Sequence, residues 1–329
     1  MNWNNARVLV TGAGGFIGSS IVEEVVRRGA QVTGFTRYTS AGTSGNIRFL
    51  PKEVRDAVRI VAGDLADAAT AANAVEGHDI VIHAAALVGI PYSYVNPVEV
   101  VLTNTMATAH ILEACRKRGI QRVVCFSTSE VYGTARYAPI DEEHPLQGQS
   151  PYSASKIGSD QIALSYQRSF GLPVAIVRPF NTYGPRQSSR AVIPTIISQA
   201  VAGKVVKLGS LTPTRDLCYV GDTARGVVRV CECDEAIGEV INIGTGHEIS
   251  IGDLAHRIFA LIGRAPEIVL DEQRVRPGNS EVMRLIADRS KAKRLLDWEP
   301  QVSLDEGLGQ TIEWIRAHPE FFAVGEYHV

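Results

Sequence analysis

The residues best suited to acid–base chemistry in this 329-residue chain are Tyr152 and Lys156, together with the segment Ser127–Glu130. Side chains at i and i+4 of a helix share one face, so the phenol of Tyr152 and the ammonium of Lys156 would point the same way. A cation beside a phenol favours the phenolate and draws its pKa from about 10 toward neutrality. Such a tyrosine can take the proton of a hydroxyl group while hydride leaves the same carbon. Thr128 would assist, and Glu130 offers a second base.

A glycine-rich segment near the N-terminus predicts a dinucleotide site. Three glycines follow the pattern G-x-x-G-x-x-G, directly after the apolar segment Arg7–Thr11 and at the start of a helical pattern. Glycines here allow a tight turn and a close approach of the backbone to a pyrophosphate, which the N-terminus of the helix attracts. The cofactor-binding residues expected in this segment are Gly12, Gly15, Phe16, Ile17 and Gly18.

Residues after the next apolar segments leave the kind of dinucleotide open. An NAD site usually has an acidic side chain at the end of its second strand, but this chain has Arg37 there. Arg37 would suit the 2′-phosphate of NADP or stack on the adenine. Further along the chain, the residues expected beside the cofactor are Asp64, Leu65, Ala84, Ala85 and Ala86.

These motifs lie between alternating β-rich and helical segments, which predict an α/β fold. Such alternation produces parallel strands joined by right-handed crossovers, with helices on both faces of one sheet. We expect a Rossmann-type doubly wound parallel sheet, whose ligands bind at the C-terminal ends of the strands. The expected strands are Arg7–Thr11, Gln31–Thr36, Val58–Ala62, Asp79–Ala84, Arg122–Ser127 and Val174–Pro179, and the longest expected helices are Ile17–Arg28, Val98–Arg118 and Tyr152–Phe170.

Beyond Pro179 the alternation weakens and Pro, Gly and Arg become denser, which indicates a smaller second lobe over the strand ends. We place a dinucleotide-binding domain at residues 1–180 and a smaller α/β substrate lobe at residues 181–329. The segments Asp216–Val220 and Val240–Ile243 are expected to return to the first domain as extra strands, within a stretch near residues 216–245. Leu304–Ala317 has the pattern of an ordinary amphipathic helix.

The composition excludes several classes of function. A formal net charge of -2 lacks the excess of Lys and Arg with which proteins coat nucleic acid or anionic membranes. No apolar segment reaches the ~18 residues of a membrane span, and the N-terminus has no secretory apolar core, so we expect a cytoplasmic protein. Cys231 and Cys233 have no second pair or histidine at zinc spacing, so no metal site is expected.

Together these motifs resemble the extended short-chain dehydrogenase/reductase family over nearly the whole chain. The resemblance also covers Thr103-Asn104, Arg178-Pro179-Phe180-Asn181, Tyr183-Gly184-Pro185-Arg186, Arg215-Asp216, Asn242-Ile243-Gly244 and Arg276-Pro277-Gly278. It implies a nucleotide-diphosphate sugar as substrate, for which guanidinium groups are suited. The further cofactor-binding residues that it implies are Asn104, Ser127, Tyr152, Lys156 and Pro179. The implied substrate-binding residues are Thr128, Asn181, Arg186, Arg215 and Arg276.

The residues after Ser127 leave the branch of this family open. Thr128-Ser129-Glu130 is the triplet of UDP-glucuronate decarboxylases, whereas 4,6-dehydratases carry Thr-Asp-Glu and 4-epimerases generally lack the acid. Residues 89–94, 148–156 and 181–188 are instead similar to the 4,6-dehydratases of legionaminic-acid biosynthesis, which act on a nucleotide-linked N-acetylglucosamine. The 5,6-dehydratases of nucleoside-antibiotic pathways are a second comparison. Because Ser129 is a poor acid, Glu130 would carry the proton from C5 to the departing C6 hydroxyl.

The resemblance therefore implies a 4,6-dehydratase of UDP- or GDP-linked N-acetylglucosamine that recycles a tightly bound NAD, with NADP as the alternative. The implied catalytic residues are Thr128, Ser129, Glu130, Tyr152 and Lys156. UDP-glucuronate decarboxylation, 5,6-dehydration and 4-epimerisation stay open among enzymes, and a non-catalytic dinucleotide sensor stays open outside them. The helices Val98–Arg118 and Tyr152–Phe170 would form a four-helix bundle in a homodimer, or would cover only their own sheet. Nothing in the sequence indicates the nucleotide base.

Overall fold

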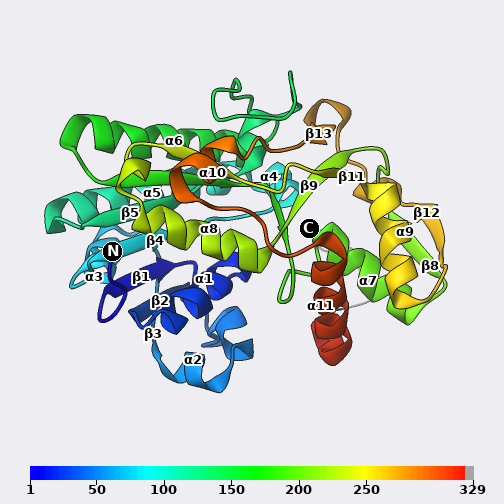
Figure 1. The fold of residues 1–329 in the computed structure, drawn as a ribbon, viewed down its shortest axis with the longest axis horizontal. Coiled ribbons are helices and arrows are strands. Elements are labelled where there is room, and N and C mark those ends of the chain that lie inside the picture. Colours follow the sequence, from blue (N-terminus) through cyan, green and yellow to red (C-terminus); the bar gives the residue numbers. More distant parts are fainter. Residues whose placement is uncertain (323–329) are drawn as a thin grey trace.

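The computed structural model describes residues 1–322, and residues 323–329 lie outside the described part. Its largest feature is a seven-stranded parallel sheet with the strand order β10-β6-β5-β4-β1-β2-β3 (Figure 1). The winding of the chain reverses between β1 and β4, as in doubly wound sheets, so the expected fold class is confirmed. The strands are β1 (Arg7–Thr11), β2 (Gln31–Arg37), β3 (Val58–Gly63), β4 (Ile80–His83), β5 (Arg122–Phe126), β6 (Val174–Pro179) and β10 (Val240–Ile243).

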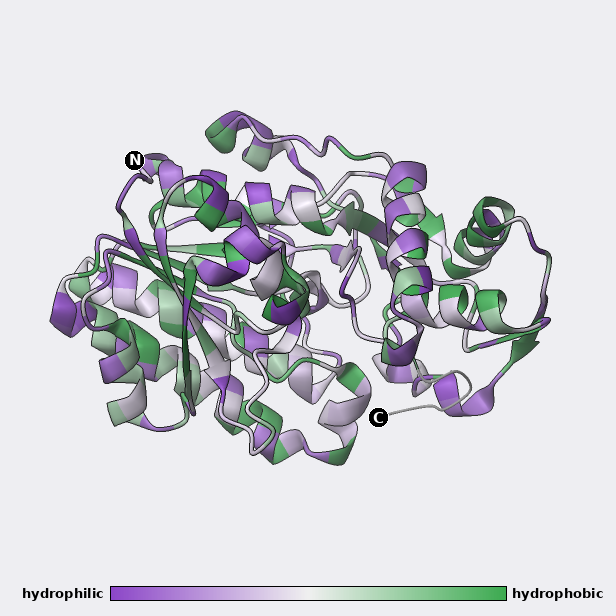
Figure 2. Ribbon diagram, turned by 90° about the horizontal axis from the view of Figure 1, so that it is seen from below, coloured by the Kyte–Doolittle hydropathy of each residue, from purple (hydrophilic) through white to green (hydrophobic). Residues whose placement is uncertain are grey.

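Two layers of helices cover the large sheet, because most of its strands carry buried apolar side chains on both faces. One face packs against α1 (Phe16–Arg27), α8 (Val220–Glu232) and α10 (Ser290–Leu296). The other packs against α3 (Ala68–Val75), α5 (Pro97–Arg118) and α6 (Pro151–Phe170). Figure 2 shows hydrophobic ribbon in the strands between these layers and more hydrophilic ribbon on the surrounding helices.

One strand that is expected in the large sheet belongs to a second, smaller sheet. A returning strand at Asp216–Val220 is expected from the sequence, and this expectation is wrong. β9 (Thr214–Tyr219) lies in a four-stranded sheet with β7 (Asn181–Tyr183), β11 (Glu248–Ser250) and β13 (Arg284–Leu285). β9 is held outside the large sheet because it pairs with β7, which follows directly after the end of β6. The chain then returns through α8 and β10, and β10 pairs with β6 as expected.

The second lobe has a hydrophobic core of its own. This core is formed by side chains of three helices and a two-stranded sheet. The helices are α7 (Val192–Ala202), α9 (Ile251–Ile262) and α11 (Leu304–Ala317), and the sheet consists of β8 (Val205–Leu208) and β12 (Glu267–Leu270). α11 begins at Ser303, whose side chain accepts a hydrogen bond from the N–H of Glu306, as is usual for a helix cap. The amphipathic helix expected at the C-terminus is therefore present.

Short helices complete the fold. η1 (Gly45–Phe49) and α2 (Lys52–Asp56) lie between β2 and β3, α4 (Ile90–Val95) precedes α5, and η2 (Ser129–Tyr132) follows β5. The other short turns are η3 (Asp234–Ala236), η4 (Glu272–Arg274), η5 (Gly278–Ser280) and η6 (Pro319–Phe321). Within residues 1–322, no helix is both long and apolar enough to cross a bilayer. In the same residues no group of His, Cys, Asp and Glu side chains is arranged to hold a metal.

Candidate active site

A cavity of about 1110 Å³ lies between the two lobes, at the C-terminal ends of the large sheet. It exceeds the ~300–1,000 Å³ typical of a pocket for one small ligand. The expected site residues that line it are Gly12, Gly15, Phe16, Ile17, Gly18, Arg37, Asp64, Leu65, Ala84, Ala85, Ala86, Ser127, Thr128, Ser129, Glu130, Tyr152, Lys156, Pro179, Asn181, Arg215 and Arg276. Asn104 and Arg186, which are also expected at the site, lie outside this lining.

The glycine turn after β1 packs closely against the loop after β4. Gly12 has a φ of +68°, and a Cβ atom on it would lie 2.8 Å from the backbone nitrogen of Ala85 and 2.9 Å from the carbonyl oxygen of Ala84. Gly15 precedes α1 without a side-chain cap, so the first N–H groups of this helix stay available. Because helix N-termini attract phosphate groups, these residues fit the pyrophosphate of a dinucleotide.

The end of β2 offers a cation with a carboxylate beside it. Arg37 lines the cavity, and its Nη2 lies 3.9 Å from Oε1 of Glu99 on α5. Glu99 also accepts a hydrogen bond of 2.6 Å from the hydroxyl of Tyr92. Asp64 follows β3 and accepts a hydrogen bond of 2.9 Å from the N–H of Ala66. Arg37 and Glu99 therefore place opposite charges at the end of β2.

Asn104 supports the cavity wall instead of forming it. It is 2% exposed, and its Oδ1 accepts a hydrogen bond of 2.8 Å from the N–H of Leu87. Its Nδ2 donates to Oγ of Ser155, at 2.9 Å, and to the carbonyl oxygen of Leu87, at 3.2 Å. The direct cofactor contact expected of Asn104 is therefore replaced by a positioning role, because both ends of its amide are used to fix the loop after β4 against α6.

His83 ends β4 beneath this loop and is neutral. It is 3% exposed, and its ring nitrogens pair with the hydroxyls of Thr11, at 2.8 Å, and Thr108, at 3.3 Å. Burial, together with a smaller contribution from the charge of Lys156, lowers its pKa to about 3. His83 is therefore a structural polar group rather than a proton donor at neutral pH.

Three charged or polar side chains follow one another along the inner face of α6. Ser150 caps the helix, since its side chain accepts a hydrogen bond from the N–H of Ser153, whose own side chain accepts one from the N–H of Ser150. This cap places Tyr152 in the first turn, at the cavity. Lys156 and Asp160 follow at intervals of one turn, and both are buried. The i, i+4 spacing therefore aligns a phenol, an ammonium and a carboxylate.

The phenol of Tyr152 holds its proton strongly. It is 7% exposed and hydrogen-bonds to Thr128. Burial raises the pKa of Tyr152 well above its ordinary value, the hydrogen bond with Thr128 lowers it in part, and the charges of Glu130 and Asp160 raise it further. The expected lowering of this pKa is therefore wrong for the chain by itself, because desolvation and the two carboxylates outweigh the hydrogen bond with Thr128.

Asp160 is a buried residue behind the cavity wall that the sequence motifs do not indicate. Its Oδ2 accepts hydrogen bonds from Oγ of Ser127, at 2.8 Å, and from Nε of Arg178, at 3.1 Å. Arg178 also donates to the hydroxyl of Tyr132, at 2.9 Å. Burial lowers the pKa of Lys156, and the charge of Asp160 acts against this lowering. Asp160 thus binds the residue after β5 and, through its charge, favours the protonated form of Lys156.

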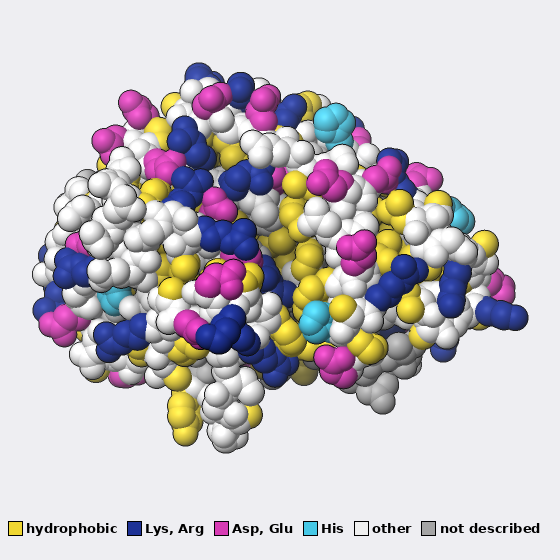
Figure 3. Space-filling model, turned by 60° about the horizontal axis from the view of Figure 1, so that its bottom comes forward, with side chains coloured by type: hydrophobic (Ala, Val, Ile, Leu, Met, Phe, Trp, Pro, Cys, Tyr) yellow, Lys and Arg dark blue, Asp and Glu magenta, His cyan; other side chains and the backbone are white. Residues whose placement is uncertain are grey.

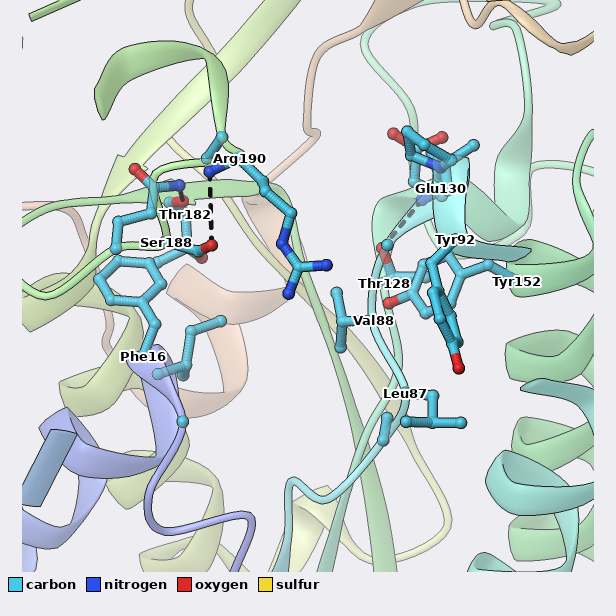
Figure 4. Close-up of a pocket in the computed structure, with 18 of the residues that line it drawn as sticks. Phe16, Leu87, Val88, Tyr92, Thr128, Glu130, Tyr152, Thr182, Ser188 and Arg190 are labelled. Carbon is cyan, nitrogen blue, oxygen red and sulfur yellow. Dashed lines mark hydrogen bonds between the residues drawn. The ribbon is translucent and has the colours of Figure 1, made fainter. Parts of the chain in front are cut away.

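Glu130 lies within η2, above Thr128 and Tyr152 in Figure 4. It is 8% exposed, and its N–H donates to Oγ1 of Thr128, at 3.3 Å. Its charge raises the pKa of Tyr152 on one side and of Arg215 on the other, although burial leaves the pKa of Arg215 lowered overall. Ser129 is only 2% exposed. The buried carboxylate therefore stands between the phenol and the arginines of the second lobe.

Two arginines share one carboxylate on the wall formed by the second lobe. Nη2 of Arg215 lies 3.2 Å from Oε1 of Glu281, and Nη1 of Arg276 lies 3.6 Å from the same oxygen. This Nη1 and the Oδ1 of Asn181 are buried without a hydrogen-bond partner. Orphaned buried polar atoms are rare in folded proteins. Their position at the cavity fits a ligand that accepts from arginine and donates to an amide oxygen.

Arg186 is wrongly expected at the substrate. Its Nη2 donates to Oγ of Ser20, at 2.9 Å, and lies 3.1 Å from Oε2 of Glu23. Both partners are on α1, so the guanidinium turns away from the cavity and ties the loop after β7 to the first domain. The left-handed backbone of Arg186, with a φ of +71°, accompanies this turn.

The sequence model of the GDP-mannose 4,6-dehydratase family matches residues 9–311 of this chain. A dTDP-glucose 4,6-dehydratase of Streptomyces antibioticus is 36% identical over 317 residues, which cover 94% of this chain and 92% of the relative. The chain belongs to the nucleotide-sugar branch of the extended short-chain dehydrogenase/reductase family. Another member, a UDP-N-acetyl-α-D-glucosaminuronate decarboxylase of Bacillus cytotoxicus, is 34% identical over 328 residues, 94% of this chain and 98% of the relative.

Solved structures of the family share this fold. A dTDP-glucose 4,6-dehydratase of Streptomyces venezuelae with NAD bound is 32% identical, with a TM-score of 0.86 over 96% of this chain and 98% of that one. A UDP-glucuronic acid 4-epimerase of Bacillus cereus, in complex with UDP-glucuronic acid and NAD, is 30% identical, with a TM-score of 0.85 over 94% and 99%. Family members therefore perform dehydration, decarboxylation or epimerisation on one scaffold.

Further cavity residues lie outside the set expected at the site. Figure 4 shows Arg190 extending from the loop before α7 toward the middle of the cavity. Leu87 and Val88 lie across from it, and Tyr92 lies beside Tyr152. Tyr92 belongs to the segment 89–94 that carries part of the resemblance, whereas Leu87, Val88 and Arg190 lie in loops without a motif. Loops on a rigid scaffold commonly carry binding residues and vary between homologues.

Proposed function

We propose that this protein is a nucleotide-sugar 4,6-dehydratase that recycles a bound NAD. The observation that carries the proposal is the buried carboxylate of Glu130, near enough to Tyr152 and Arg215 to raise the pKa of each by its charge. A 4-epimerase moves hydride at C4 alone and needs no second base. Dehydration across C5 and C6 requires one, and Glu130 is placed between the phenol and the arginines that would hold the diphosphate.

The first domain supports NAD as the cofactor. The glycine turn and the N-terminus of α1 would hold its pyrophosphate, and Ala84, Ala85 and Ser127 would flank the remainder. When bound, NAD would supply the acceptor and later the donor of hydride, together with a positive charge beside the phenol. The carboxylate of Glu99 near Arg37 would repel a 2′-phosphate. This arrangement supports NAD rather than NADP.

The first step would oxidise the sugar at C4. Tyr152 would take the proton of the 4-hydroxyl while hydride leaves C4, which becomes a ketone. Thr128 orients the phenol through their hydrogen bond. Lys156, one turn along α6, supplies the positive charge that favours the phenolate form needed to accept the proton.

The second step would eliminate water. The C4 ketone acidifies the hydrogen on C5, and Glu130 would take this proton and deliver it to the C6 hydroxyl. That oxygen leaves as water with the electrons of its bond to C6. The hydride first taken from C4 returns to C6, and C5 regains a proton. One proton is gained by Tyr152 and one is supplied to C5, so the sugar loses only water.

We propose UDP- or GDP-linked N-acetylglucosamine as the substrate. Residues from all three segments that resemble the enzymes of legionaminic-acid biosynthesis, 89–94, 148–156 and 181–188, line the cavity. They surround the space between Tyr152 and the two arginines, where the hexose would lie. Arg215 and Arg276 would bind the diphosphate as bidentate donors, in place of the Glu281 carboxylate that they now share.

A substrate panel and one variant test the proposal. The protein should convert UDP- or GDP-N-acetylglucosamine to a 4-keto-6-deoxy product, observed by mass spectrometry. Glu130→Gln should lower turnover roughly 10²–10⁴-fold, still reduce bound NAD when substrate is added, and fail to exchange the C5 hydrogen in heavy water. Glu143→Gln, a change at an exposed glutamate nearby, is the control. Normal exchange in Glu130→Gln would remove Glu130 from the role of base.

The decarboxylase alternative rests on the triplet Thr128-Ser129-Glu130 and on the relative from Bacillus cytotoxicus. It predicts release of carbon dioxide from UDP-glucuronate without loss of a C6 hydroxyl. The same panel, with UDP-glucuronate included, separates the two reactions.

We also propose a homodimer formed through α5 and α6. The two helices pack side by side on the large sheet. Large apolar side chains are exposed on α5 at one-turn spacing, namely Val98, Leu102 and Met106. Side chains at this spacing form one stripe along a helix. A second copy of the same pair would bury the stripe in a four-helix bundle.

A further inference from the structure

A cluster of aromatic rings joins the C-terminal part of the chain to the first domain. Phe49, the last residue of η1, has its ring centroid 5.6 Å from that of Trp314, 5.3 Å from His318 and 5.3 Å from Phe321. Each of the three contacts is edge-to-face, with interplanar angles of 82° to 89°. The guanidinium of Arg48 covers the Phe49 ring at 4.6 Å. We call these rings the aromatic lock.

The lock is anchored in the core of the second lobe. Trp314 and Phe321 pack against the hydrophobic cluster formed by α7, α9 and α11, whereas Phe49 comes from the segment between β2 and β3. Figure 3 shows hydrophobic side chains gathered along the seam between the two lobes on this side of the molecule. Phe49 is thus a residue of the first domain whose ring partners belong to the second.

The segment that carries Phe49 lies over the glycine turn. Residues 38–50, which we call the strap, run from the end of β2 through η1. Within the strap, the N–H of Asn46 donates to the carbonyl oxygen of Gly14 at 2.8 Å. Gly45 has a φ of +60°, and a Cβ atom on it would lie 2.8 Å from Cα of Gly14. Strap residues that line the cavity are Thr39, Thr43 and Gly45.

A second contact holds the same strap to the second lobe. Nδ2 of Asn46 donates to the carbonyl oxygen of Arg186 at 3.0 Å. The side chain of Arg186 in turn binds Ser20 and Glu23 on α1. The strap is therefore fixed beside the glycine turn by Asn46 in its middle and by Phe49 at its end.

We propose that the strap and the aromatic lock retain the bound dinucleotide, with Phe49 as the residue that keeps the strap closed. This inference rests on the proposed function, in which the pyrophosphate lies at the glycine turn. The strap borders that turn and lines the cavity beside it, so it would cover part of a dinucleotide bound there. Opening the strap requires the Phe49 ring to leave three aromatic partners at once. An enzyme that returns hydride to its own substrate gains from such retention, because loss of the reduced cofactor would end the cycle.

The test measures the dissociation rate of NAD from the purified full-length protein. Bound NAD is released into an excess of an NAD-consuming enzyme, and its loss from the protein is followed over time. Phe49→Ala should increase the dissociation rate at least tenfold, which corresponds to about 1.4 kcal/mol. Phe49→Leu, which keeps an apolar side chain but loses the ring contacts, should show an intermediate increase and guards against a folding defect in the alanine variant.

Phe170→Ala provides a matched control. Phe170 also makes an edge-on contact, with Tyr166 at 5.1 Å, and lies under a guanidinium, that of Arg116 at 5.0 Å. It lies at the far end of α6, however, and does not line the cavity. Its loss should leave the dissociation rate of NAD unchanged.

The outcomes distinguish this inference from the proposed function. Unchanged dissociation in folded Phe49→Ala and Phe49→Leu would overturn the role of the lock while leaving the dehydratase proposal intact. An equal acceleration in Phe170→Ala would also overturn it, because the effect would then be general destabilisation. If the unaltered protein holds no NAD at all, the proposed function itself fails.

Discussion

Asp160→Asn is the single substitution whose effect can be worked out most fully from the structure. The carboxylate is 2% exposed and its partner Arg178 is 3% exposed, with Nη2 at 3.0 Å from Oδ2. Neutralising one member of a buried ion pair leaves the other charge unpaired and typically costs about 3–5 kcal/mol. Arg178 keeps its bond to Tyr132 and an asparagine oxygen can still accept from Ser127. We therefore expect the free energy of unfolding to fall by about 3 kcal/mol, at the lower end of this range.

Denaturant unfolding measures this loss directly, from the shift in midpoint at constant slope. Asp297→Asn, in an exposed pair with Lys293, is the matched control and should leave the unfolding midpoint nearly unchanged, because water screens an exposed pair. The double variant Asp160→Leu with Arg178→Met should recover most of the stability, since apolar replacement of a whole buried pair is often neutral. A cost below about 1 kcal/mol in Asp160→Asn would refute the buried-pair reasoning.

The same variant should change the pH dependence of activity. The charge of Asp160 raises the pKa of Lys156, which burial lowers. Without that charge the pKa of Lys156 falls further, and the protonated lysine that the proposed mechanism requires is lost at a lower pH. The fall in kcat on the alkaline side of its pH profile should therefore occur at lower pH in Asp160→Asn. The same shift is expected in the double variant, whose stability is restored. An unmoved alkaline limb in both would confine Asp160 to a structural role.

Three further predictions concern the rest of the molecule. Gly12→Ala should abolish copurification of NAD, because its Cβ would collide with the backbone after β4, whereas Gly42→Ala, in open space at a similar φ, should retain it. Since the pKa of His83 is lowered to about 3, stability should fall as pH drops from about 6.5 toward 3, and His83→Gln should flatten that part of the unfolding curve. Met106→Glu should convert the proposed dimer to a monomer in light scattering, while Lys117→Glu on the exposed end of α5 should not.

The large sheet could be predicted because its information is local. Each strand is a short apolar run and each crossover a helical pattern, and all seven strands begin and end within one residue of the expected range. The sheet to which β9 belongs could not be predicted in this way. Its segment looks like any other strand, but its partners β7, β11 and β13 lie far apart in the sequence. Which sheet a strand joins depends on such distant pairings, and a single sequence does not contain them in readable form.

The site residues also fall into two groups, those that local sequence predicts and those that depend on contacts distant in the sequence. Residues within a motif, such as Tyr152 and Lys156, fall at the cavity because the motif sets their spacing on one helix. Arg186 also lies in a motif, yet its guanidinium binds Glu23 instead of a ligand, because an arginine side chain is long enough to reach either. Asp160 could have been found, since it continues the i, i+4 series of Tyr152 and Lys156. Phe49 could not, because its role depends on rings more than 260 residues away.

The pKa of Tyr152 connects the fold to the chemistry. Burial raises it, and the nearby charges of Glu130 and Asp160 raise it further, so the chain alone holds the proton on the phenol. Lys156 is itself desolvated, which lowers its own pKa. In the proposed reaction, Tyr152 would therefore act as a base only once the charges of bound ligands enter the cavity. The same burial would keep water from the C4 ketone, so a site that forms phenolate only when filled would also protect the intermediate that the phenolate creates.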